Sequence, residues 1–465
     1  MKNALEVNLD LVKKYNVPAP RYTSYPTALQ FRDAVADDAV FEIMRKDIAD
    51  GGNVISVYIH IPFCKSLCWY CGCTTVPARD DATAERYLDF IEKEIALWKK
   101  QLAPDGQTLS VAQLHFGGGT PSALTPTQID RIAAMLRAHF TFTPDAEISV
   151  ELDPRSLTRE IVEAFRRLGC SRASLGVQDL NPKVQVAIHR VQPKPLIEQA
   201  VRWLRESGFS SVNFDLIYGL PFQSTESYEA TLDELLALQP DRFAVFSYAH
   251  VPWLKPQQKL LEQSGGLPSP DEKIALLKTI IEKLTRNGFV YIGLDHFARE
   301  DDELVHALRE HRLQRNFQGY STHAGLPIVA LGMSSISQSA RSFSQNEKAL
   351  DAYEARVAAG SLPQIKSLIL TEEDLRRREI ITGIMCNLEL DYTRLSERFG
   401  FDFKTRYAEE IAKLDPLAAD GLIAFREDGN GFSVTHVGRM FIRNIALPFD
   451  AYFQSGTPNR HSKAV

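Results

Sequence analysis

Short apolar runs alternate with segments of helical periodicity through the middle of this chain. This alternation predicts βα units whose strands share one parallel sheet. Right-handed crossovers would curl six such units into an open α/β barrel, with its site at the carboxyl ends of the strands. The six strand-like runs lie near residues 54–62, 111–117, 146–152, 172–178, 212–218 and 242–248, and helical segments such as 84–97 and 195–204 lie between them.

The segment 15–27 before the first run follows a different pattern. It is rich in tyrosine and proline and has no helical periodicity. Disordered leaders are normally poor in aromatic residues. We therefore predict an arm that packs on the protein and touches the mouth of the barrel.

Beyond residue 365 the pattern becomes mostly helical. Thr371 and Asp374 resemble a capping box at the start of a helix, and further helices are expected over 392–398 and 403–419. Residues 421–435 form a predicted hairpin with its turn at 428–431. Helices followed by a hairpin suggest a small winged-helix-like domain. The predicted division is an arm at 1–50, a barrel with a C-terminal extension at 51–364, a helical, winged-helix-like lid at 365–455 and a tail at 456–465.

Composition and charge exclude several classes of partner. A net charge of −6 and a pI near 6.0 provide no basic surface for nucleic acid. The sequence contains no signal peptide and no long apolar span, so we expect no membrane association. Six cysteines in 465 residues fit a reducing compartment, and we expect a cytoplasmic protein. No helix pattern suggests a long dimer seam, so a monomer is expected.

Four cysteines lie within ten residues, directly after the first strand-like run. They are Cys64, Cys68, Cys71 and Cys73. A reducing compartment argues against disulfides, and structural zinc usually takes two separated pairs of ligands. The C-x3-C-x2-C spacing supplies three thiolates to a four-iron cluster and leaves one iron open. We favour that cluster and keep zinc as the alternative, while the distant Cys170 and Cys386 are interpreted as core thiols.

This cysteine motif after a strand resembles that of the radical S-adenosylmethionine (SAM) superfamily. The resemblance implies a partial (β/α)6 TIM-type radical SAM barrel. It also implies a [4Fe-4S] cluster held by Cys64, Cys68 and Cys71, with SAM on the open iron. The motif alone indicates the superfamily and not the substrate.

Motifs outside the cysteine loop resemble one family within this superfamily, the oxygen-independent coproporphyrinogen III oxidases. The similarity extends from about residue 15 to about residue 455. The segments that carry it are 15–27, 58–64, 71–73, 218–221, 295–298, 315–320, 331–337 and 438–444.

The resemblance implies a role for each matching position. Cys73 would be a fourth sulfur close to the cluster, and Arg21 and Arg315 are candidates to bind propionate groups of the substrate. The residues implied to touch the first SAM are Tyr58, Gly118, Glu151 and Ile336. Those implied to touch a second SAM are Tyr70, Gly119, Thr120, Gln178, Arg190, Asp215 and Ala249.

The implied reaction is oxidative decarboxylation of two propionate groups of coproporphyrinogen III to vinyl groups in haem biosynthesis. A flavodoxin- or ferredoxin-type protein would supply electrons. Two alternatives remain: a haem-trafficking paralogue and a radical SAM methyltransferase. Such paralogues lack the arm motif at 20–26 and the position of Cys73, both of which are present here. A methyltransferase would transfer a methyl group from the second SAM to its product.

Overall fold

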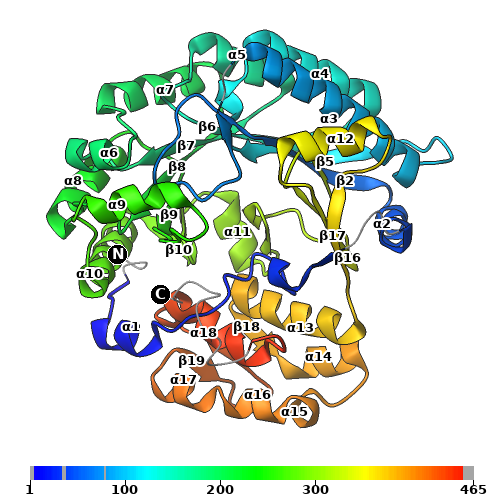
Figure 1. Cartoon of the computed structure of the whole chain (residues 1–465). Helices are drawn as coiled ribbons and strands as arrows, with labels where there is room; N and C mark the ends of the chain where they lie inside the picture. The colour runs from blue at the N-terminus through cyan, green and yellow to red at the C-terminus, as the bar shows by residue number, and fades with distance from the viewer. Residues whose placement is uncertain (1–4, 34–37, 78–79, 454–465) are drawn as a thin grey trace.

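Six parallel strands form the centre of the molecule, in the order that the apolar runs predict (Figure 1). The computed structural model describes residues 5–33, 38–77 and 80–453. Each strand pairs in parallel with the next, which confirms the predicted α/β barrel. The strands are β2 (Val54–Ile61), β5 (Ser110–Gly118), β6 (Thr141–Leu152), β7 (Arg172–Gln178), β8 (Ser211–Tyr218) and β9 (Arg242–Ser247).

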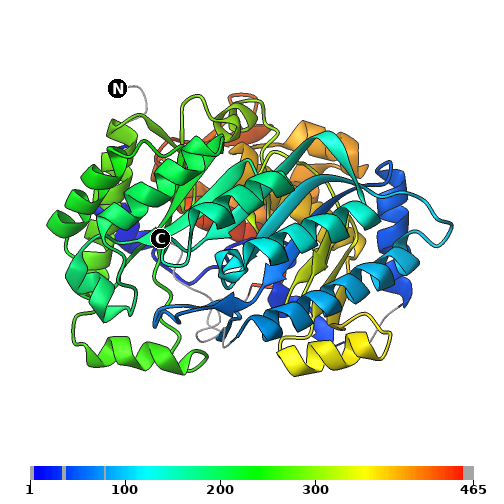
Figure 2. The same ribbon diagram turned by 90° about the horizontal axis from the view of Figure 1, so that it is seen from above.

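The sheet extends beyond these six strands at both edges. A seventh parallel strand, β14 (Ile328–Leu331), pairs with β2 and was not predicted, because a four-residue apolar run has no diagnostic period. The remaining strands pair antiparallel and continue the sheet, which curves around the interior (Figure 2). Beside β14 these are β15 (Ile336–Gln338), β16 (Ser342–Asn346), β17 (Gln364–Ile369) and β1 (Arg32–Asp33), and beside β9 they are β11 (His296–Arg299) and β10 (Phe289–Gly293).

Helices cover the outer face of the barrel (Figure 1). The predicted helical segments 84–97 and 195–204 lie within α3 and α7. Helix α4 begins where Thr125 and Gln128 form a capping box and Pro126 occupies the first turn. The long helices are α2 (Asp38–Asp50), α3 (Asp81–Leu102), α4 (Pro126–His139), α5 (Arg159–Leu168), α7 (Lys194–Glu206), α8 (Thr225–Leu236) and α10 (Pro270–Arg286). The shorter ones are α6 (Pro182–Ala187), α9 (Lys259–Gln263), α11 (Glu303–Arg309) and α12 (Leu350–Ala358).

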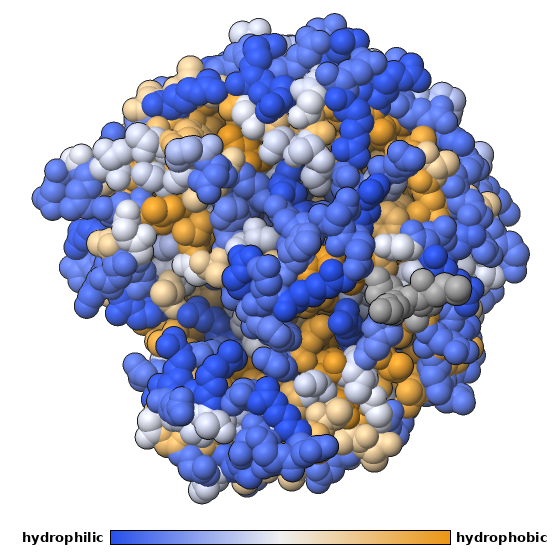
Figure 3. All heavy atoms as spheres, turned by 180° about the vertical axis from the view of Figure 1, so that it is seen from behind, coloured by the Kyte–Doolittle hydropathy of each residue, from blue (hydrophilic) through white to orange (hydrophobic). Residues whose placement is uncertain are grey.

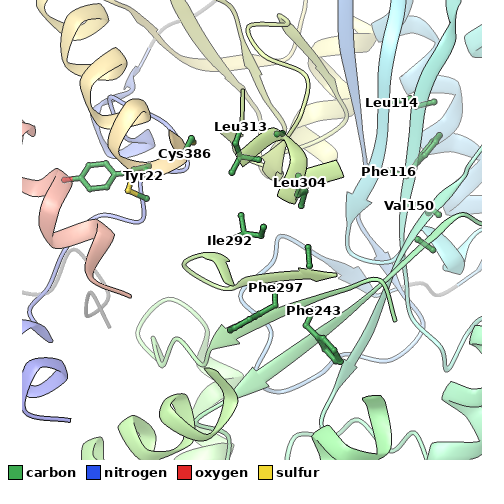
Figure 4. Close-up of a cluster of buried hydrophobic side chains, with 14 of the residues drawn as sticks. Tyr22, Leu114, Phe116, Val150, Phe243, Ile292, Phe297, Leu304, Leu313 and Cys386 are labelled. Carbon is green, nitrogen blue, oxygen red and sulfur yellow. The ribbon is translucent and has the colours of Figure 1, made fainter. Parts of the chain in front are cut away.

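Side chains alternate between the two faces of the barrel strands. On β8, Val212, Phe214 and Leu216 are buried in the hydrophobic core, while Asn213 and Asp215 lie on the opposite face. Figure 4 shows other members of the same core on β5, β6 and β9. The interior face is therefore free to carry polar groups toward a site.

The C-terminal region is mostly helical, as predicted. Helix α13 (Glu372–Thr382) begins at the capping box of Thr371 and Asp374. The predicted hairpin is present, but it joins a third, very short strand that the sequence pattern did not reveal. The elements are α14 (Tyr392–Phe399), β18 (Glu389–Asp391), β19 (Ile423–Phe425), β20 (Gly431–Val434) and α18 (Ile442–Ala446).

The helix expected over 403–419 is interrupted. It consists of α15 (Phe403–Arg406), α16 (Ala408–Ala412) and α17 (Asp415–Ala419). Tyr407 separates the first two with a φ of −112° and a ψ of 31°, outside the helical range. Pro416 lies in the first turn of the third, where the missing N–H is tolerated.

The arm at residues 15–27 is packed and contacts the C-terminal region, a contact that was not predicted; its contact with the mouth of the barrel remains a prediction. A short helix, α1 (Leu9–Tyr15), precedes it and was not predicted. Tyr22 and Tyr25 are buried, and the hydroxyl of Tyr22 donates to Asp450 at 3.1 Å. Arg443 donates from Nε to the carbonyl of Pro20 at 2.9 Å. The arm thus joins residues that lie more than 400 positions apart.

No helix in the described part of the chain is long and apolar enough to cross a membrane. Hydrophilic residues cover most of the face seen in Figure 3, and apolar residues show between them in scattered patches. The predicted tail at 456–465 lies outside the described residues. The predicted domain boundaries and the lid role of the C-terminal region remain predictions.

His296 should make the fold sensitive to acid. Its ring lies between Phe246 and Tyr320, with centroid separations of 6.1 and 5.3 Å. Burial, together with nearby Arg315, lowers the pKa of His296 to about 3. Because the unfolded chain binds this proton near pH 6.5, stability present above that pH is lost as the pH falls.

We therefore expect His296→Phe, which keeps a ring, to reduce the acid sensitivity. Between pH 7.5 and pH 5.5, the parent should lose about 1.4 kcal/mol more unfolding free energy than the variant. Urea unfolding of both proteins at the two pH values measures this difference. The exposed His306→Phe variant controls for the loss of one histidine. Equal losses in parent and His296→Phe would contradict the prediction.

Candidate functional site

A cavity of about 230 Å³ lies at the carboxyl ends of the parallel strands. All four clustered cysteines, Cys64, Cys68, Cys71 and Cys73, line it. Residues at the ends of β5, β6, β7 and β8 complete its wall, as expected for a site at this edge of a barrel. Of the side chains predicted to bind cofactor, the cavity brings together Tyr70, Gly118, Gly119, Thr120, Glu151, Gln178, Arg190 and Asp215.

The loop that carries the cysteines is held by its surroundings. Its ends form two short parallel strands, β3 (Phe63–Cys64) and β4 (Val76–Pro77). Between them, Trp69 donates its backbone N–H to the carbonyl of Ile188 at 3.1 Å. Lys255 donates from Nζ to the carbonyl of Cys73 at 2.6 Å. The segments after β7 and β9 therefore fix the path of the cysteine loop.

Two arginines contact the sulfur of Cys68. Arg155 donates from Nη2 to Sγ at 3.2 Å, and Arg190 donates from Nη1 to the same atom at 3.3 Å. Both guanidinium groups also pair with Asp153, at 2.6 and 3.0 Å. Burial raises the pKa of the Asp153 carboxyl, but the two arginines outweigh it and hold the pKa below its ordinary value. The Asp153 carboxylate thus holds the guanidinium groups of Arg155 and Arg190 in hydrogen-bonding contact with Cys68 Sγ.

The other cysteines differ in their surroundings. Burial raises the pKa of Cys64 to about 11, while its thiol donates to Thr120 Oγ1 at 3.7 Å. A hydrogen bond from Cys73 lowers the pKa of Cys71 to about 6. The backbone N–H of Cys73 also donates to Cys71 Sγ, at 3.4 Å. Cys73 therefore stabilises the thiolate of its neighbour.

The cysteines fit a cluster that takes three thiolates. All six cysteines of the chain are free. Among the described residues, no three His, Cys, Asp or Glu side chains converge as a site for one metal ion. A four-iron cluster instead takes its ligands on separate irons, which suits thiols distributed around a cavity.

The glycines after β5 allow close contact between the ends of β5 and β2. Gly118 has a φ of +115°, and a Cβ there would lie 2.6 Å from the ring of His60. A Cβ on Gly119 would lie 2.4 Å from the carbonyl oxygen of Pro62. Only glycine fits these positions without displacing the start of the cysteine loop.

Two carboxylates, Glu151 and Asp215, line the cavity. Glu151 is half exposed and accepts from the backbone N–H of Gly118 at 3.3 Å. Asp215 accepts from Ser174 Oγ at 2.7 Å and from Asn213 Nδ2 at 2.8 Å, and burial raises its pKa to about 7. These groups can accept hydrogen bonds from the hydroxyl and ammonium groups of a ligand.

Three predicted cofactor residues, Tyr58, Ala249 and Ile336, do not line this cavity. Tyr58 stacks on His115, whose Nε2 lies 3.3 Å from Glu151 Oε1. The carbonyl of Ala249 accepts from Gln258 at 3.2 Å, and the same amide donates to the carbonyl of Tyr70. Tyr58 and Ala249 therefore support residues of the wall.

Ile336 and the two predicted substrate arginines lie elsewhere. Ile336 packs on the cluster of Phe31 and Phe343. Arg21 donates to the carboxylate of Asp295. Arg315 lines a second, smaller cavity. The fold therefore separates these residues from the cysteines.

Asp153 and Arg155 line the cavity, but the sequence analysis did not assign them a role. They follow Glu151 in a Glu-Leu-Asp-Pro-Arg segment at the end of β6. Their position after a barrel strand was a usable signal for Asp153. The contact of Arg155 with Cys68 joins positions 87 residues apart, which local patterns do not reveal.

Comparison with known families covers two parts of the chain. Residues 58–235 match the Radical SAM superfamily, and residues 370–441 match the HemN C-terminal domain. The first match contains the cysteine loop, the second half of β2 and all of β5, β6, β7 and β8. The second contains α13, α14 and the hairpin.

Similarity to individual proteins extends over nearly the whole chain. The oxygen-independent coproporphyrinogen III oxidase of Escherichia coli K12 is 41% identical over 450 residues, which are 97% of this chain and 96% of that protein. The protein of the same description from Helicobacter pylori J99 is 39% identical over 452 residues, 97% of this chain and 98% of that protein. The solved structure of the Escherichia coli coproporphyrinogen III oxidase (HemN), described as a radical SAM enzyme, has a TM-score of 0.89 at 40% identity and covers 97% of this chain and 100% of that chain. The chain therefore belongs to the oxygen-independent coproporphyrinogen III oxidase family of the radical SAM superfamily.

Proposed function

We propose that this protein oxidatively decarboxylates two propionate side chains of coproporphyrinogen III to vinyl groups, giving protoporphyrinogen IX. The observation that carries the proposal is the joint presence of three motif cysteines on one cavity and full-length identity near 40% to oxidases of this name. The arm and Cys73, which distinguish this family from the haem-trafficking alternative, are both present.

We propose that Cys64, Cys68 and Cys71 hold the [4Fe-4S] cluster. When bound, the cluster and SAM supply one-electron radical chemistry. Arg155 and Arg190 hold the sulfur of Cys68 in place, and Cys73 does the same for Cys71. Cys73 is not needed as a ligand in this assignment.

The remaining wall supports SAM binding. Glu151 and Asp215 accept hydrogen bonds from SAM, and the glycines before Thr120 allow the ligand to approach the backbone. Gln178, Arg190 and Tyr70 are proposed to contact a second SAM. Tyr58 and Ala249 position this wall.

We further propose that the protein is a cytoplasmic monomer and receives electrons from a reduced flavodoxin- or ferredoxin-type protein. The cluster requires a one-electron reductant, and proteins of these types supply one. Sedimentation of the reconstituted protein tests the monomer. Cluster reduction by each purified donor under anaerobic conditions tests the partner.

Anaerobic turnover tests the reaction. The reconstituted, reduced protein receives SAM and coproporphyrinogen III, and mass spectrometry follows the tetrapyrrole and 5′-deoxyadenosine. We expect the loss of two carboxyl groups, with 5′-deoxyadenosine formed alongside. A methylated product or S-adenosylhomocysteine would indicate methyl transfer. An unchanged tetrapyrrole with tightly bound haem would indicate trafficking, and either result would overturn the proposal.

Arg155→Gln should make the cluster harder to reduce. Hydrogen bonds to cluster sulfurs tune the reduction potential, and this change removes a cationic donor 3.2 Å from Cys68 Sγ. A cationic donor favours the reduced, more negative cluster. We expect the midpoint potential to fall by roughly 40–60 mV, equivalent to about 1–1.4 kcal/mol for one electron.

A reductive titration followed by electron paramagnetic resonance measures this potential. Arg166→Gln is the matched control, since Arg166 donates instead to the carbonyl of Cys170 at 3.3 Å. Equal potentials for parent and Arg155→Gln, at equal iron content, would contradict the assignment of Cys68 as a ligand beside Arg155.

A further inference from the structure

A second cavity, of about 30 Å³, lies where the arm meets the C-terminal region and the edge of the sheet. Tyr22, Ser24 and Tyr25 of the arm form one side of it. Figure 4 shows Tyr22 beside Cys386, which also lines it. Its polar groups come from three further segments that lie far apart in the chain: Arg315, Gln338 and Arg378.

This cavity brings together two arginines, Arg315 and Arg378, that form no ion pair with the described residues. Arg315 has two buried nitrogens, Nε and Nη1, without a hydrogen-bond partner among the described residues. Its guanidinium stacks 4.8 Å above the ring of Tyr320. Arg378 donates from Nη2 to the carbonyl of Ala340, which is neutral. Neither arginine forms an ion pair within the described part of the chain.

The three carboxylates that act electrostatically on Arg378 each have a closer partner elsewhere. Asp47 pairs with Arg341 at 2.5 Å, and Glu379 accepts from Arg398 at 2.8 Å. Asp374 accepts from Tyr452 at 2.8 Å and also closes the capping box of α13. By contrast, Arg190, Arg242 and Arg377 each pair with a carboxylate. The buried nitrogens of Arg315 have no such partner among the described residues, and a buried charge without one is costly, so the second cavity is suited to an anion.

A row of side chains connects this cavity to the cysteine cavity. Phe246 lines the cysteine cavity and packs edge-on against His296. His296 packs edge-on against Tyr320, and the guanidinium of Arg315 lies over the ring of Tyr320. A ligand that extends from the cysteines toward Arg315 would follow this row.

Strand β15 places Gln338 of the second cavity close to Ile336. Ile336 and Gln338 are two positions apart on β15, so their side chains lie on the same face. Two residues along a strand span roughly 7 Å. Ile336, the position predicted to touch SAM, therefore lies beside the second cavity and outside the cysteine cavity.

We propose that the second cavity binds a carboxylate of the substrate, a propionate group that does not react while it is held there. Arg315 and Arg378 supply the positive charge, Gln338 supplies an amide, and the arm closes the cavity. This inference rests on the proposed function and deepens it. It adds Arg378 and Gln338 to Arg315, which the sequence had already suggested as a propionate-binding residue.

Replacement of each arginine by glutamine tests the site in the reconstituted enzyme. For Arg315→Gln and Arg378→Gln, we expect KM for coproporphyrinogen III to rise about 10- to 100-fold, as for the loss of a charge-assisted hydrogen bond. Iron content and SAM affinity should stay at parent values. Arg376→Gln is the matched control on the same helix, since Arg376 pairs with Glu372 and Glu373 outside the cavity.

A binding measurement separates this inference from the proposed function. Fluorescence quenching reports the affinity of the holoenzyme for coproporphyrin III and for its tetramethyl ester, which has no free carboxylate. We expect the two glutamine variants to weaken binding of the acid and to leave binding of the ester unchanged. Arg315→Lys, which keeps the charge, should bind the acid more tightly than Arg315→Gln does. This recovery would show that the loss in Arg315→Gln comes from the missing charge and not from misfolding.

The outcomes are distinct. Parent-like KM and acid affinity in both glutamine variants would overturn the carboxylate site even if the enzyme decarboxylates. Equal weakening for the acid and the ester would also overturn it, because the effect would then be structural. Arginine-dependent binding of the acid without any decarboxylation would support the site and refute the proposed reaction.

Discussion

Cys71→Ser is expected to abolish cluster assembly and turnover. The serine hydroxyl is a poor iron ligand, and the remaining sulfurs cannot replace Cys71 at its position in the loop. Even partners outside the ligand shell of a metal contribute 10- to 100-fold. We therefore expect more than about 100-fold less product, with iron content and visible absorbance near background.

Cys73→Ser provides the matched control. It lies two residues away and lines the same cavity, but it is assigned a supporting role through its contacts with Cys71. This variant should retain four irons per chain and bind SAM. Iron analysis and absorbance of both reconstituted variants make the comparison. If Cys73→Ser loses its iron and Cys71→Ser keeps it, the ligand assignment is wrong.

Gly119→Ala is expected to have the second largest effect. The added Cβ would lie 2.4 Å from the oxygen and 2.5 Å from the carbon of the Pro62 carbonyl, both of which are backbone atoms. Pro62 directly precedes the start of the cysteine loop, and Gly119 donates its N–H to Ile61 at 2.8 Å. The strand ends must separate to admit the methyl group. We expect the unfolding free energy to fall by about 3 kcal/mol.

The turnover rate of Gly119→Ala should be affected more strongly than its unfolding free energy. A displacement near 1 Å at a catalytic site can cost about 100-fold in rate, and we expect a loss of that size at saturating SAM. Urea unfolding and anaerobic turnover measure the two effects. Gly72→Ala is the control, because a Cβ at Gly72 has no neighbour within 4 Å. Retention of parent activity in Gly119→Ala would refute the role of this close contact.

The local periodicity of the sequence was sufficient to predict the barrel. Strands β2, β5, β6, β7, β8 and β9 each have enough apolar residues between turns to be recognised. The seventh parallel strand, β14, has four residues, and β18 has three, which is too few for a period. The break at Tyr407 depends on tertiary packing, since this side chain is fully buried.

The cysteine cavity was predictable because its residues follow the strands in a regular way. The cysteine loop, the glycines, Glu151 and Asp215 all lie at or near the carboxyl end of a barrel strand. The residues of the second cavity follow no comparable sequence pattern. Its lining joins Tyr22, Arg315, Gln338 and Arg378 from separate segments, and only the folded chain brings them together.

The contacts between the arm and the C-terminal region determine which parts of the chain can fold first during synthesis. Tyr22 meets Asp450, a partner 428 positions later in the chain. At ribosomal speeds of about 5–20 residues per second, the arm waits roughly 20 to 90 seconds for that partner. The six parallel strands, complete by Ser247, precede it. The barrel and its cysteine loop can therefore form while the side later covered by the arm is still open.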